Sequence, residues 1–449
     1  MEGVKSKKNC DLKDKDFFEI IKTLIFSIIG VSFFFFPLIV DKKLTSPVFY
    51  LSDFIYLNHR NFVYTCIVVF IFLFLIKSVS KKEKSIFDKS FILLRVLSII
   101  ILTVLILKND IIFIKNEDLA QIMKDNIFKL TVLFPLSALF LPFLLEYGFI
   151  YVLDGYFSRF TKKFLRLSGK SVLLFFIFFF VDSFVGFYTV YKMYKDGKIR
   201  KNECANILLN YPILQISIVI YIANQLNLSI TVLLITSISV FLITNYIICR
   251  IFPLKNIEKT FLIKNKYKEK SYKRNKFKMS LITYLENRNK KNLLKHILEY
   301  FNDAINIVAD IIPLFILCFW CVDFVCESDL ILYIFQIPYK NFLELLKIPC
   351  STSISETVIL AFFNQIYPME VFTGDINLIS RMIIALIVIT QGVCLTSNIV
   401  FITRYMNFIP YRDIFIIYLE KVIITTFIIF LIYYLNLGFS ISGFGIFII

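Results

Sequence analysis

The sequence predicts an all-α, polytopic transmembrane helix bundle of about nine to ten spanning helices, with two re-entrant helical hairpins that form an inverted repeat. Three observations lead to this fold class. The chain has 449 residues, of which 58% are hydrophobic, and its mean hydropathy is +0.75. Several apolar stretches exceed the ~18 residues that a helix needs to cross a hydrocarbon core of ~30 Å. Two further apolar stretches carry a polar interruption near their middle.

The uninterrupted apolar segments define the spanning helices in chain order. The predicted spans are residues 18–40, 61–76, 91–107, 128–150, 205–223, 228–252, 303–325, 378–403 and 413–435. Residues 330–349 are also apolar, but they contain Pro338, Lys340 and Glu344. Because proline interrupts a helix and charges avoid the membrane core, we expect an interfacial or broken helix there.

The charge of the loops sets the predicted orientation. The formal net charge is +17, and residues 255–295 hold 14 Lys and Arg against 3 acidic residues. Such a basic segment also suits RNA or anionic lipid. We interpret it instead as a cytoplasmic loop, because basic residues stay on the cytoplasmic side of membrane proteins. The basic N-terminal tail is cytoplasmic by the same rule. The sequence thus predicts a multi-pass protein of the bacterial cytoplasmic (inner) membrane, with the lipid bilayer and not nucleic acid as a partner.

The first interrupted segment is residues 171–191, in which Asp182 to Gly186 break the apolar run. If this segment crossed the membrane, the following residues 192–201, with 5 Lys and Arg, would lie outside. A re-entrant hairpin returns the chain to the side from which it entered and keeps this loop cytoplasmic. The sequence therefore predicts a helix–break–helix hairpin with both ends in the cytoplasm.

The second interrupted segment is residues 351–372, which contain Asn364, Gln365 and Pro368. Residues before it are acidic, at Glu327 and Asp329. Acidic loops are usual outside, so this hairpin is expected to enter from the outer side. Paired broken segments in corresponding halves indicate the binding site of a transporter.

A weak internal repeat supports two equivalent halves. Residues 164–169 resemble residues 345–350, and at the same offset of 181 residues Arg200 meets Arg381. These matches divide the chain into residues 1–127, an N-terminal three-helix membrane segment, and 128–254, a first repeat. Residues 255–295 then form the basic cytoplasmic loop, and residues 296–449 form the second repeat.

Polar residues within the repeats are the candidate site. Amides both donate and accept hydrogen bonds, so they suit a neutral polar solute such as a nucleoside. A carboxylate at bilayer depth usually has a functional role, which favours Asp182 as a relay for H⁺ or Na⁺. The same amides also serve to join helices. The predicted substrate-binding residues are Asp182, Ser183, Gly186, Asn210, Gln215, Asn364, Gln365 and Gln391.

Enzymatic chemistry is not expected. The chain has no G-x-S-x-G, H-E-x-x-H or P-loop motif, and its two histidines are distant in sequence. Cys318 and Cys321 form a C-x-x-C, but they lie in an apolar helix without a second pair. We interpret them as small apolar side chains, and predict neither a metal nor a cofactor.

Several short motifs carry a family resemblance. They are Arg166-Leu167-Ser168-Gly169-Lys170-Ser171, Asp182-Ser183-Phe184-Val185-Gly186, Tyr194-Lys195-Asp196-Gly197, Glu344-Leu345-Leu346-Lys347-Ile348-Pro349 and Thr390-Gln391. On these motifs the chain resembles the YjiH-type integral membrane proteins with a nucleoside-recognition (Gate) domain. Related domains occur in spore maturation proteins, concentrative nucleoside transporters and ferrous-iron transporter B. Ser183 stands where the family has a glycine, Asn364 stands where it has an aspartate, and this chain lacks the glutamate that the family has near Ser397, which alters any ion coupling.

Two functions of different classes follow. The first is a membrane transporter that moves a small polar solute, nucleoside-like in chemistry, by alternating access. The second is a polytopic scaffold or morphogenesis protein without transport activity, like the spore-maturation relatives. A solvated cavity that joins the two hairpins favours transport, whereas a dry, packed midplane favours the scaffold.

Overall fold

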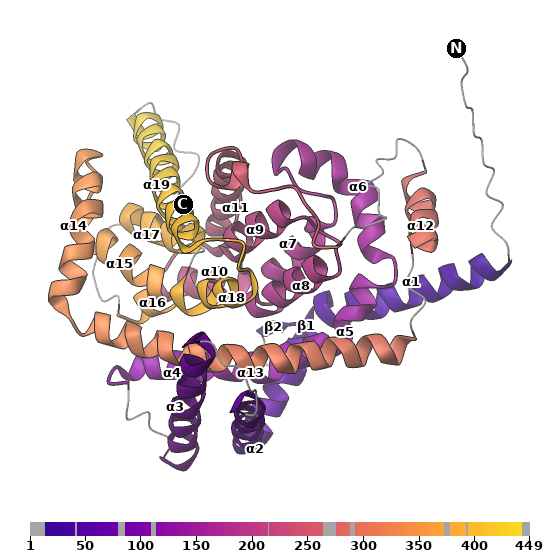
Figure 1. The fold of residues 1–449 in the computed structure, drawn as a ribbon. Helices are drawn as coiled ribbons and strands as arrows, with labels where there is room; N and C mark the ends of the chain where they lie inside the picture. Colours follow the sequence, from indigo (N-terminus) through magenta and orange to yellow (C-terminus); the bar gives the residue numbers. More distant parts are fainter. Residues whose placement is uncertain are drawn as a thin grey trace.

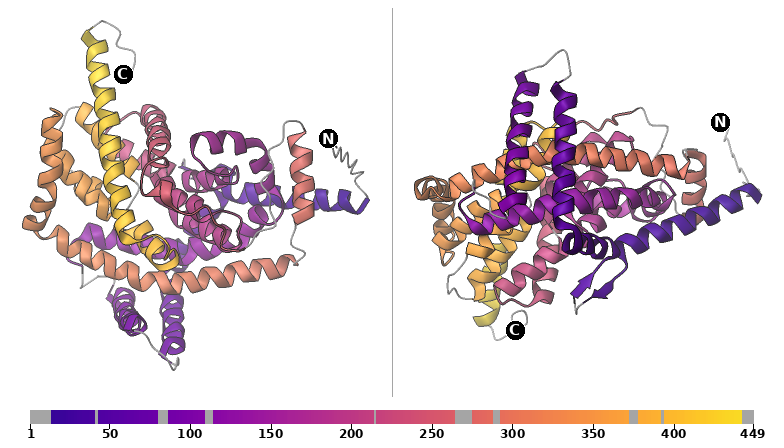
Figure 2. Two further views of the ribbon diagram at one scale, coloured as in Figure 1. Left: turned by 45° about the horizontal axis from the view of Figure 1, so that its top comes forward. Right: turned by 90° about the horizontal axis from the view of Figure 1, so that it is seen from below.

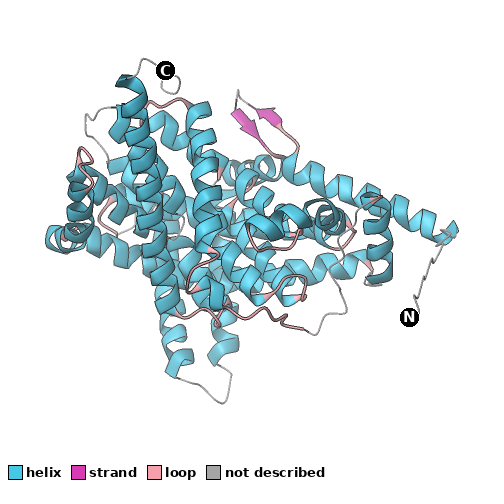
Figure 3. Cartoon of the chain, turned by 90° about the horizontal axis from the view of Figure 1, so that it is seen from above, coloured by secondary structure: helices cyan, strands magenta, loops and turns pink. Residues whose placement is uncertain are grey.

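The computed structural model describes residues 14–40, 43–79, 86–108, 114–213, 215–263, 275–287, 292–371, 378–391 and 394–441. Within these residues the protein is helical, apart from one small antiparallel hairpin of β1 (Leu38–Val40) and β2 (Lys43–Thr45), visible in Figure 3. The predicted all-α class is therefore confirmed for the bulk of the described chain.

The elements of the first half precede the basic loop. They are α1 (Asp14–Phe35), α2 (Pro47–Val79), α3 (Ile86–Lys108), α4 (Glu117–Phe128), the π-helical turn η1 (Lys129–Leu133), α5 (Phe134–Leu145), α6 (Phe149–Phe164), α7 (Ser171–Phe180), α8 (Ser183–Lys195), α9 (Lys201–Asn210), the 3-10 turn η2 (Tyr211–Ile213), α10 (Ile216–Gln225), α11 (Ile230–Ile248) and η3 (Leu254–Asn256).

The second half begins with a helix of the basic loop and then a helix of 34 residues. Its elements are α12 (Lys276–Asn287), α13 (Leu293–Cys326), α14 (Asp329–Leu345), α15 (Ser351–Phe363), α16 (Tyr367–Val371), α17 (Leu378–Gln391), the π-helical η4 (Leu395–Ile399), α18 (Val400–Tyr405) and α19 (Tyr411–Ile441).

The long helix α13 organises the molecule. It packs lengthwise against α5, and it crosses beneath the helices of both halves in Figure 1. Helices α6 to α9 lie to one side of this view and α14 to α17 to the other, with α10 and α18 between them, while α2 and α3 project away from α13 (Figures 1 and 2). Contacts of α11 with α17 and α19 join the two halves.

Five helical stretches among the described residues are long and apolar enough to cross a membrane. They are Pro47–Leu73, Glu117–Leu145, Ile230–Ile248, Leu293–Cys326 and Tyr411–Ile432. Large apolar side chains, such as Phe62 and Phe324, are exposed on these helices, as expected for a membrane protein.

This number is smaller than the nine to ten spans that the sequence predicts. Two predicted spans are divided in the structure. Residues 205–223 break at η2, because Pro212 has no amide hydrogen to continue helix α9. Residues 378–403 divide between α17 and η4, around residues 392–393, which lie outside the described part.

Residues 171–195 form two short antiparallel helices. Helix α7 has 10 residues, which corresponds to a length of roughly 15 Å and is too short to cross a membrane. The chain reverses at Val181, and α8 packs back against α7. At the far end, the Lys170 ammonium donates to the Lys198 carbonyl at 3.2 Å. The chain thus enters and leaves this hairpin at the same end.

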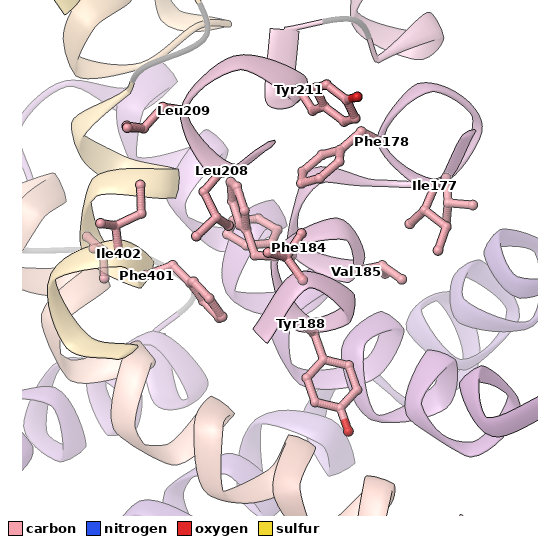
Figure 4. Close-up of a cluster of buried hydrophobic side chains, with 14 of the residues drawn as sticks. Ile177, Phe178, Phe184, Val185, Tyr188, Leu208, Leu209, Tyr211, Phe401 and Ile402 are labelled. Carbon is pink, nitrogen blue, oxygen red and sulfur yellow. The ribbon is translucent and has the colours of Figure 1, made fainter. Parts of the chain in front are cut away.

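Tight contacts hold this hairpin. A Cβ atom at Gly186 would lie 2.4 Å from the Phe178 ring, so only glycine allows α8 to approach α7 this closely. Figure 4 shows that Phe401 and Ile402 of α18 face the apolar side chains of α8 and α9. Phe401 stacks on Phe187 with ring centroids 5.5 Å apart, so a segment from the second half completes the core of the first hairpin.

An ion cluster fixes the end of α8 to α5 and α13. Lys198 forms an ion pair with Glu146, and the Tyr300 hydroxyl donates to Glu146 Oε1 at 2.5 Å. Beside them, Lys192 Nζ lies 2.8 Å from Asp303 Oδ2. Since these charges are largely buried, each depends on its partner for stability.

The same contacts shift two pKa values. Burial opposes ionisation of Glu146, but the Lys198 ammonium and the Tyr300 hydroxyl outweigh it and lower the pKa of Glu146. Burial likewise opposes the charge of Lys198, but Glu146 and Asp196 raise the pKa of Lys198. A lowered carboxyl pKa stabilises the fold above about pH 4.5, and this contribution disappears as the pH falls further. A raised lysine pKa stabilises the fold below about pH 10.5, and this contribution disappears at higher pH.

Lys198→Met is therefore expected to lower the free energy of unfolding by about 3 kcal/mol at neutral pH, because it leaves the Glu146 carboxylate buried without its cation. Below about pH 4.5 the unfolding temperature should also fall less in the variant than in the wild type. Thermal unfolding of the purified protein in detergent measures both effects. The control is Lys195→Met, since this lysine also forms an ion pair, with Asp303, but its side chain is 43% exposed. Equal losses for the two variants would contradict the assignment.

Candidate functional site

A polar cavity of about 240 Å³ lies between the two broken segments. Its walls come from η1, the two breaks, and the segments that follow α9 and α17. The lining residues are Asn126, Lys129, Asp182, Ser183, Phe184, Pro212, Gln215, Ser217, Ile218, Tyr221, Asn364, Gln365, Ile366, Cys394 and Thr396. The cavity thus brings together residues of both halves that are distant in the sequence.

Asp182 occupies the first break. Its backbone is extended, and its Oδ1 accepts a hydrogen bond from the Phe184 amide at 2.7 Å, which caps the N-terminus of α8. Its Oδ2 accepts from Gln215 Nε2 at 3.3 Å. A helix N-terminus carries partial positive charge, so it favours a carboxylate at this place.

Asn364 occupies the second break in the same way. Its backbone is extended, and its Oδ1 accepts from the Ile366 and Tyr367 amides at 2.8 and 3.2 Å, which caps α16. Its Nδ2 donates to Thr396 Oγ1 at 3.2 Å. The Asn364 amide therefore caps the helix that follows the second break, as the Asp182 carboxylate caps the helix that follows the first.

Each break is also held by a residue from the next broken helix of its own half. Gln215 Nε2 donates to the carbonyl of Val181, the residue before Asp182, at 3.4 Å. Thr396 Oγ1 donates to the carbonyl of Phe363, the residue before Asn364, at 2.9 Å. Both contacts satisfy a carbonyl that the end of a helix leaves without an intrahelical partner.

The cavity contains charges of both signs. Asp182 is 3% exposed, and Lys129 of η1 lines the same cavity and acts electrostatically on it. In the part of the chain that the structure describes, the two groups do not form an ion pair within the usual distance. A solute between them would meet one negative group, one positive group and several amides. This arrangement suits a polar molecule without net charge.

Comparisons with known proteins add little about function. No model of a protein family matches the chain, and no solved structure matches it at a significant level. The chain is similar to an uncharacterized protein of Alkalihalophilus pseudofirmus, with 23% identity over 302 residues. The match covers 66% of this chain and 65% of that protein, so the chain spans about two thirds of that relative. The name of the relative states no activity, and the function must therefore be argued from the site.

Five of the eight predicted site residues line the cavity: Asp182, Ser183, Gln215, Asn364 and Gln365. Gly186 does not, because it packs against Phe178 inside the hairpin. Asn210 does not either, since it is buried and its Nδ2 donates to Asn206 Oδ1 at 2.6 Å. The side chain of Gln391 lies outside the described part of the structure.

Several lining residues were not among the predicted set. Lys129 is the first residue of η1, where the wider π-helical turn interrupts the α-helix, and Asn126 lies in the last turn of α4. Ser217 and Tyr221 continue the face that begins at Gln215. The available signal was the spacing of four residues between Ser217 and Tyr221, because residues four apart share a helix face.

Thr396→Val is expected to reduce the free energy of unfolding by about 2 kcal/mol. The change keeps the shape but leaves the Phe363 carbonyl and the Asn364 amide without the hydroxyl. Thermal unfolding measures the loss. Thr390→Val is the matched control, because Thr390 is equally buried but its hydroxyl only supplements a helical bond, to the Leu386 carbonyl. A control that loses as much as Thr396→Val would remove the special role of the contact.

Proposed function

We propose that the protein is a transporter that carries a small polar solute without net charge, nucleoside-like in chemistry, across a bacterial inner membrane by alternating access. The observation that supports it most is the cavity that Asp182 and Asn364 share at the two helix breaks. Broken helices expose backbone groups and capping side chains, and transporters use such groups to hold solutes at mid-membrane. A cavity of about 240 Å³ lies just under the ~300–1,000 Å³ typical of ligand sites, which favours a small solute.

In this proposal the two halves are an inverted repeat. The ends of α5 and α13, the ends of α6 and α14, and the starts of α11 and α19 are all separated by 181 residues: Leu145 and Cys326, Phe164 and Leu345, Ile230 and Tyr411. Arg166 and Lys347, also 181 residues apart, both have positive φ, of 56° and 54°. This correspondence supports repeats that start with α4 and α13, earlier than residue 128 in the first case.

The first hairpin is proposed to be re-entrant, with both ends cytoplasmic like the N-terminus. Cysteines placed at the exposed positions Lys163 and Lys259, on a background without native cysteines, should then react with impermeant thiol reagents from the same side. A cysteine at exposed Gln225 should react from the other side. Labelling of 163 and 259 from opposite sides would contradict the hairpin.

The roles in the site follow from the chemistry of the side chains. Gln215, Asn364 and Gln365 would donate and accept hydrogen bonds to hydroxyl and carbonyl groups of the solute. Asp182 and Lys129 would bind its polar ends, and Asp182 would carry the dependence on a coupling H⁺ or Na⁺. Tyr221 offers a half-buried ring and a hydroxyl to one edge of the solute.

Uptake by the purified protein in liposomes tests the proposal. Counterflow of labelled uridine, adenosine and a panel of neutral polar solutes should show at least one saturable substrate. Ser183→Leu, which places an apolar side chain in the cavity, should abolish counterflow without lowering the unfolding temperature. Folded wild-type protein that moves no member of the panel would overturn the proposal.

The alternative is a membrane scaffold without transport. It is favoured by the tight packing of the hairpin around Gly186 and Phe187, which resembles the interior of a rigid protein. In that case the Ser183→Leu variant should restore the phenotype of a deletion strain as fully as the wild-type protein does. A transporter would instead lose complementation with the same variant.

A further inference from the structure

Lys421 is a lysine in the middle of the apolar helix α19, and its side chain is entirely buried, with 0% exposure. Its ammonium donates a hydrogen bond to the Leu209 carbonyl at 2.8 Å. No carboxylate of the described residues forms an ion pair with it. A buried charge normally has a charged partner, so its contact with a backbone carbonyl calls for an explanation.

The carbonyl belongs to the broken end of α9. This helix ends at Asn210, and Pro212 follows without an amide hydrogen. The last carbonyls of a helix lack intrahelical partners and carry partial negative charge. A second acceptor lies at this end, because Asn210 Oδ1 is buried and has no hydrogen-bond partner among the described atoms. The broken end of α9 thus presents oxygen atoms that attract a cation.

Among the described residues no ion pair competes for this ammonium, and the carboxylate next in the chain, Glu420, has a buried Oε2 without a hydrogen-bond partner. The titratable group that acts on the Lys421 ammonium is the Cys394 thiol, which also lines the polar cavity. Lys421 therefore sits behind the cavity wall, between α19 and the end of α9. The neighbouring helices α11 and α17 pack against α19.

We propose that the broken end of α9 is a site for a monovalent cation, and that the Lys421 ammonium is its permanent occupant, supplied by the chain itself. Backbone carbonyl and amide oxygens are suitable ligands for such a cation. The ammonium joins α19 of the second half to α9 of the first, and it leaves no place there for a free ion. The inference does not depend on transport. If the protein is a transporter, this end of α9 does not bind Na⁺.

Removal of the side chain should turn the site into one for a free ion. Purified Lys421→Ala in detergent is expected to unfold about 5 °C below the wild type in choline chloride. NaCl, ammonium chloride or methylammonium chloride at equal ionic strength should restore part of that loss. The wild type should unfold at the same temperature in all four salts, because its site is already filled.

Two further variants separate charge from volume. Lys421→Met fills the space without a cation, so it should be destabilised and should not respond to the small cations. Lys421→Arg keeps a cationic donor, so it should remain more stable than Lys421→Met and also insensitive to salt. A folded Lys421→Ala with the same unfolding temperature in choline and in every small cation would overturn the proposal. If Lys421→Ala does not fold, an arginine variant no more stable than Lys421→Met would overturn it as well.

Discussion

Asp182→Asn is expected to reduce solute uptake by at least about tenfold while the protein remains folded. Asparagine caps a helix about as well as aspartate, so the hydrogen bond to the Phe184 amide should persist. The charge does not persist. Asp182 is the acidic residue among those that line the cavity in the described structure, and its loss leaves the Lys129 ammonium without an opposite charge. A charge-assisted bond to the solute or to Gln215 becomes a weaker neutral one.

Uptake into liposomes between about pH 5 and pH 8 measures this effect. Asp154→Asn is the matched control, since Asp154 is equally buried and its Oδ1 accepts from the Gly169 amide at 2.8 Å, away from the cavity. Asn398→Ala should also cost less uptake, because Asn398 Oδ1 accepts from the Cys394 amide and supports the backbone there. If Asp182→Asn transports like the wild type over this range, the carboxylate has only a capping role.

Gly169→Ala should have a large effect on stability, a loss of about 3 kcal/mol in the free energy of unfolding or a failure to accumulate in membranes. Gly169 lies where the chain turns from α6 into the first hairpin. A Cβ atom there would lie 2.6 Å from Asp154 Cα and 2.8 Å from the Ser158 amide nitrogen. These are backbone atoms of α6, which cannot move without bending the helix. The methyl group would therefore push the whole hairpin away from α6.

Gly30→Ala is the control for this prediction. Its added Cβ would lie 3.0 Å from the Leu144 side chain and 3.1 Å from Phe143 Cβ, so a shift of the neighbours by a few tenths of an ångström relieves the contact without a clash with backbone atoms. We expect a loss below about 1 kcal/mol. Thermal unfolding and yield in membranes compare the two variants. Similar behaviour of both would mean that the contact with α6 is not as rigid as the distances imply.

The two breaks could be predicted from the sequence because polar residues interrupt otherwise apolar runs. Asp182 and Asn364 stand out among phenylalanine, isoleucine and valine, and such residues are rare in membrane segments unless they have a role. That both would cap the second helix of their hairpin is a local property. It follows from the preference of aspartate and asparagine for helix N-termini.

Other parts of the site could not be predicted. Lys129 lies at the edge of a predicted span, and a π-helical turn has no sequence signature, so its entry into the cavity depends on tertiary structure. Gly186 follows Asp182 closely, and the sequence predicts it as a substrate-binding residue because glycine permits close approach to the backbone. In the structure the Phe178 ring occupies the space beside Gly186, because the lack of a side chain at a glycine also allows two helices to pack closely.

The contacts of Gln215 and Thr396 have a mechanical consequence. Each of these residues hydrogen-bonds the break of a hairpin to the next broken helix of the same half, so the break and that helix should move as one rigid unit. A break cannot move away by itself without losing this hydrogen bond. In the proposed transporter the cavity would then open only if the rigid unit of one half slides past that of the other, at the cavity that Asp182 and Asn364 both line. The hinges of such a movement would lie outside the hairpins, in the connections that precede α7 and α15.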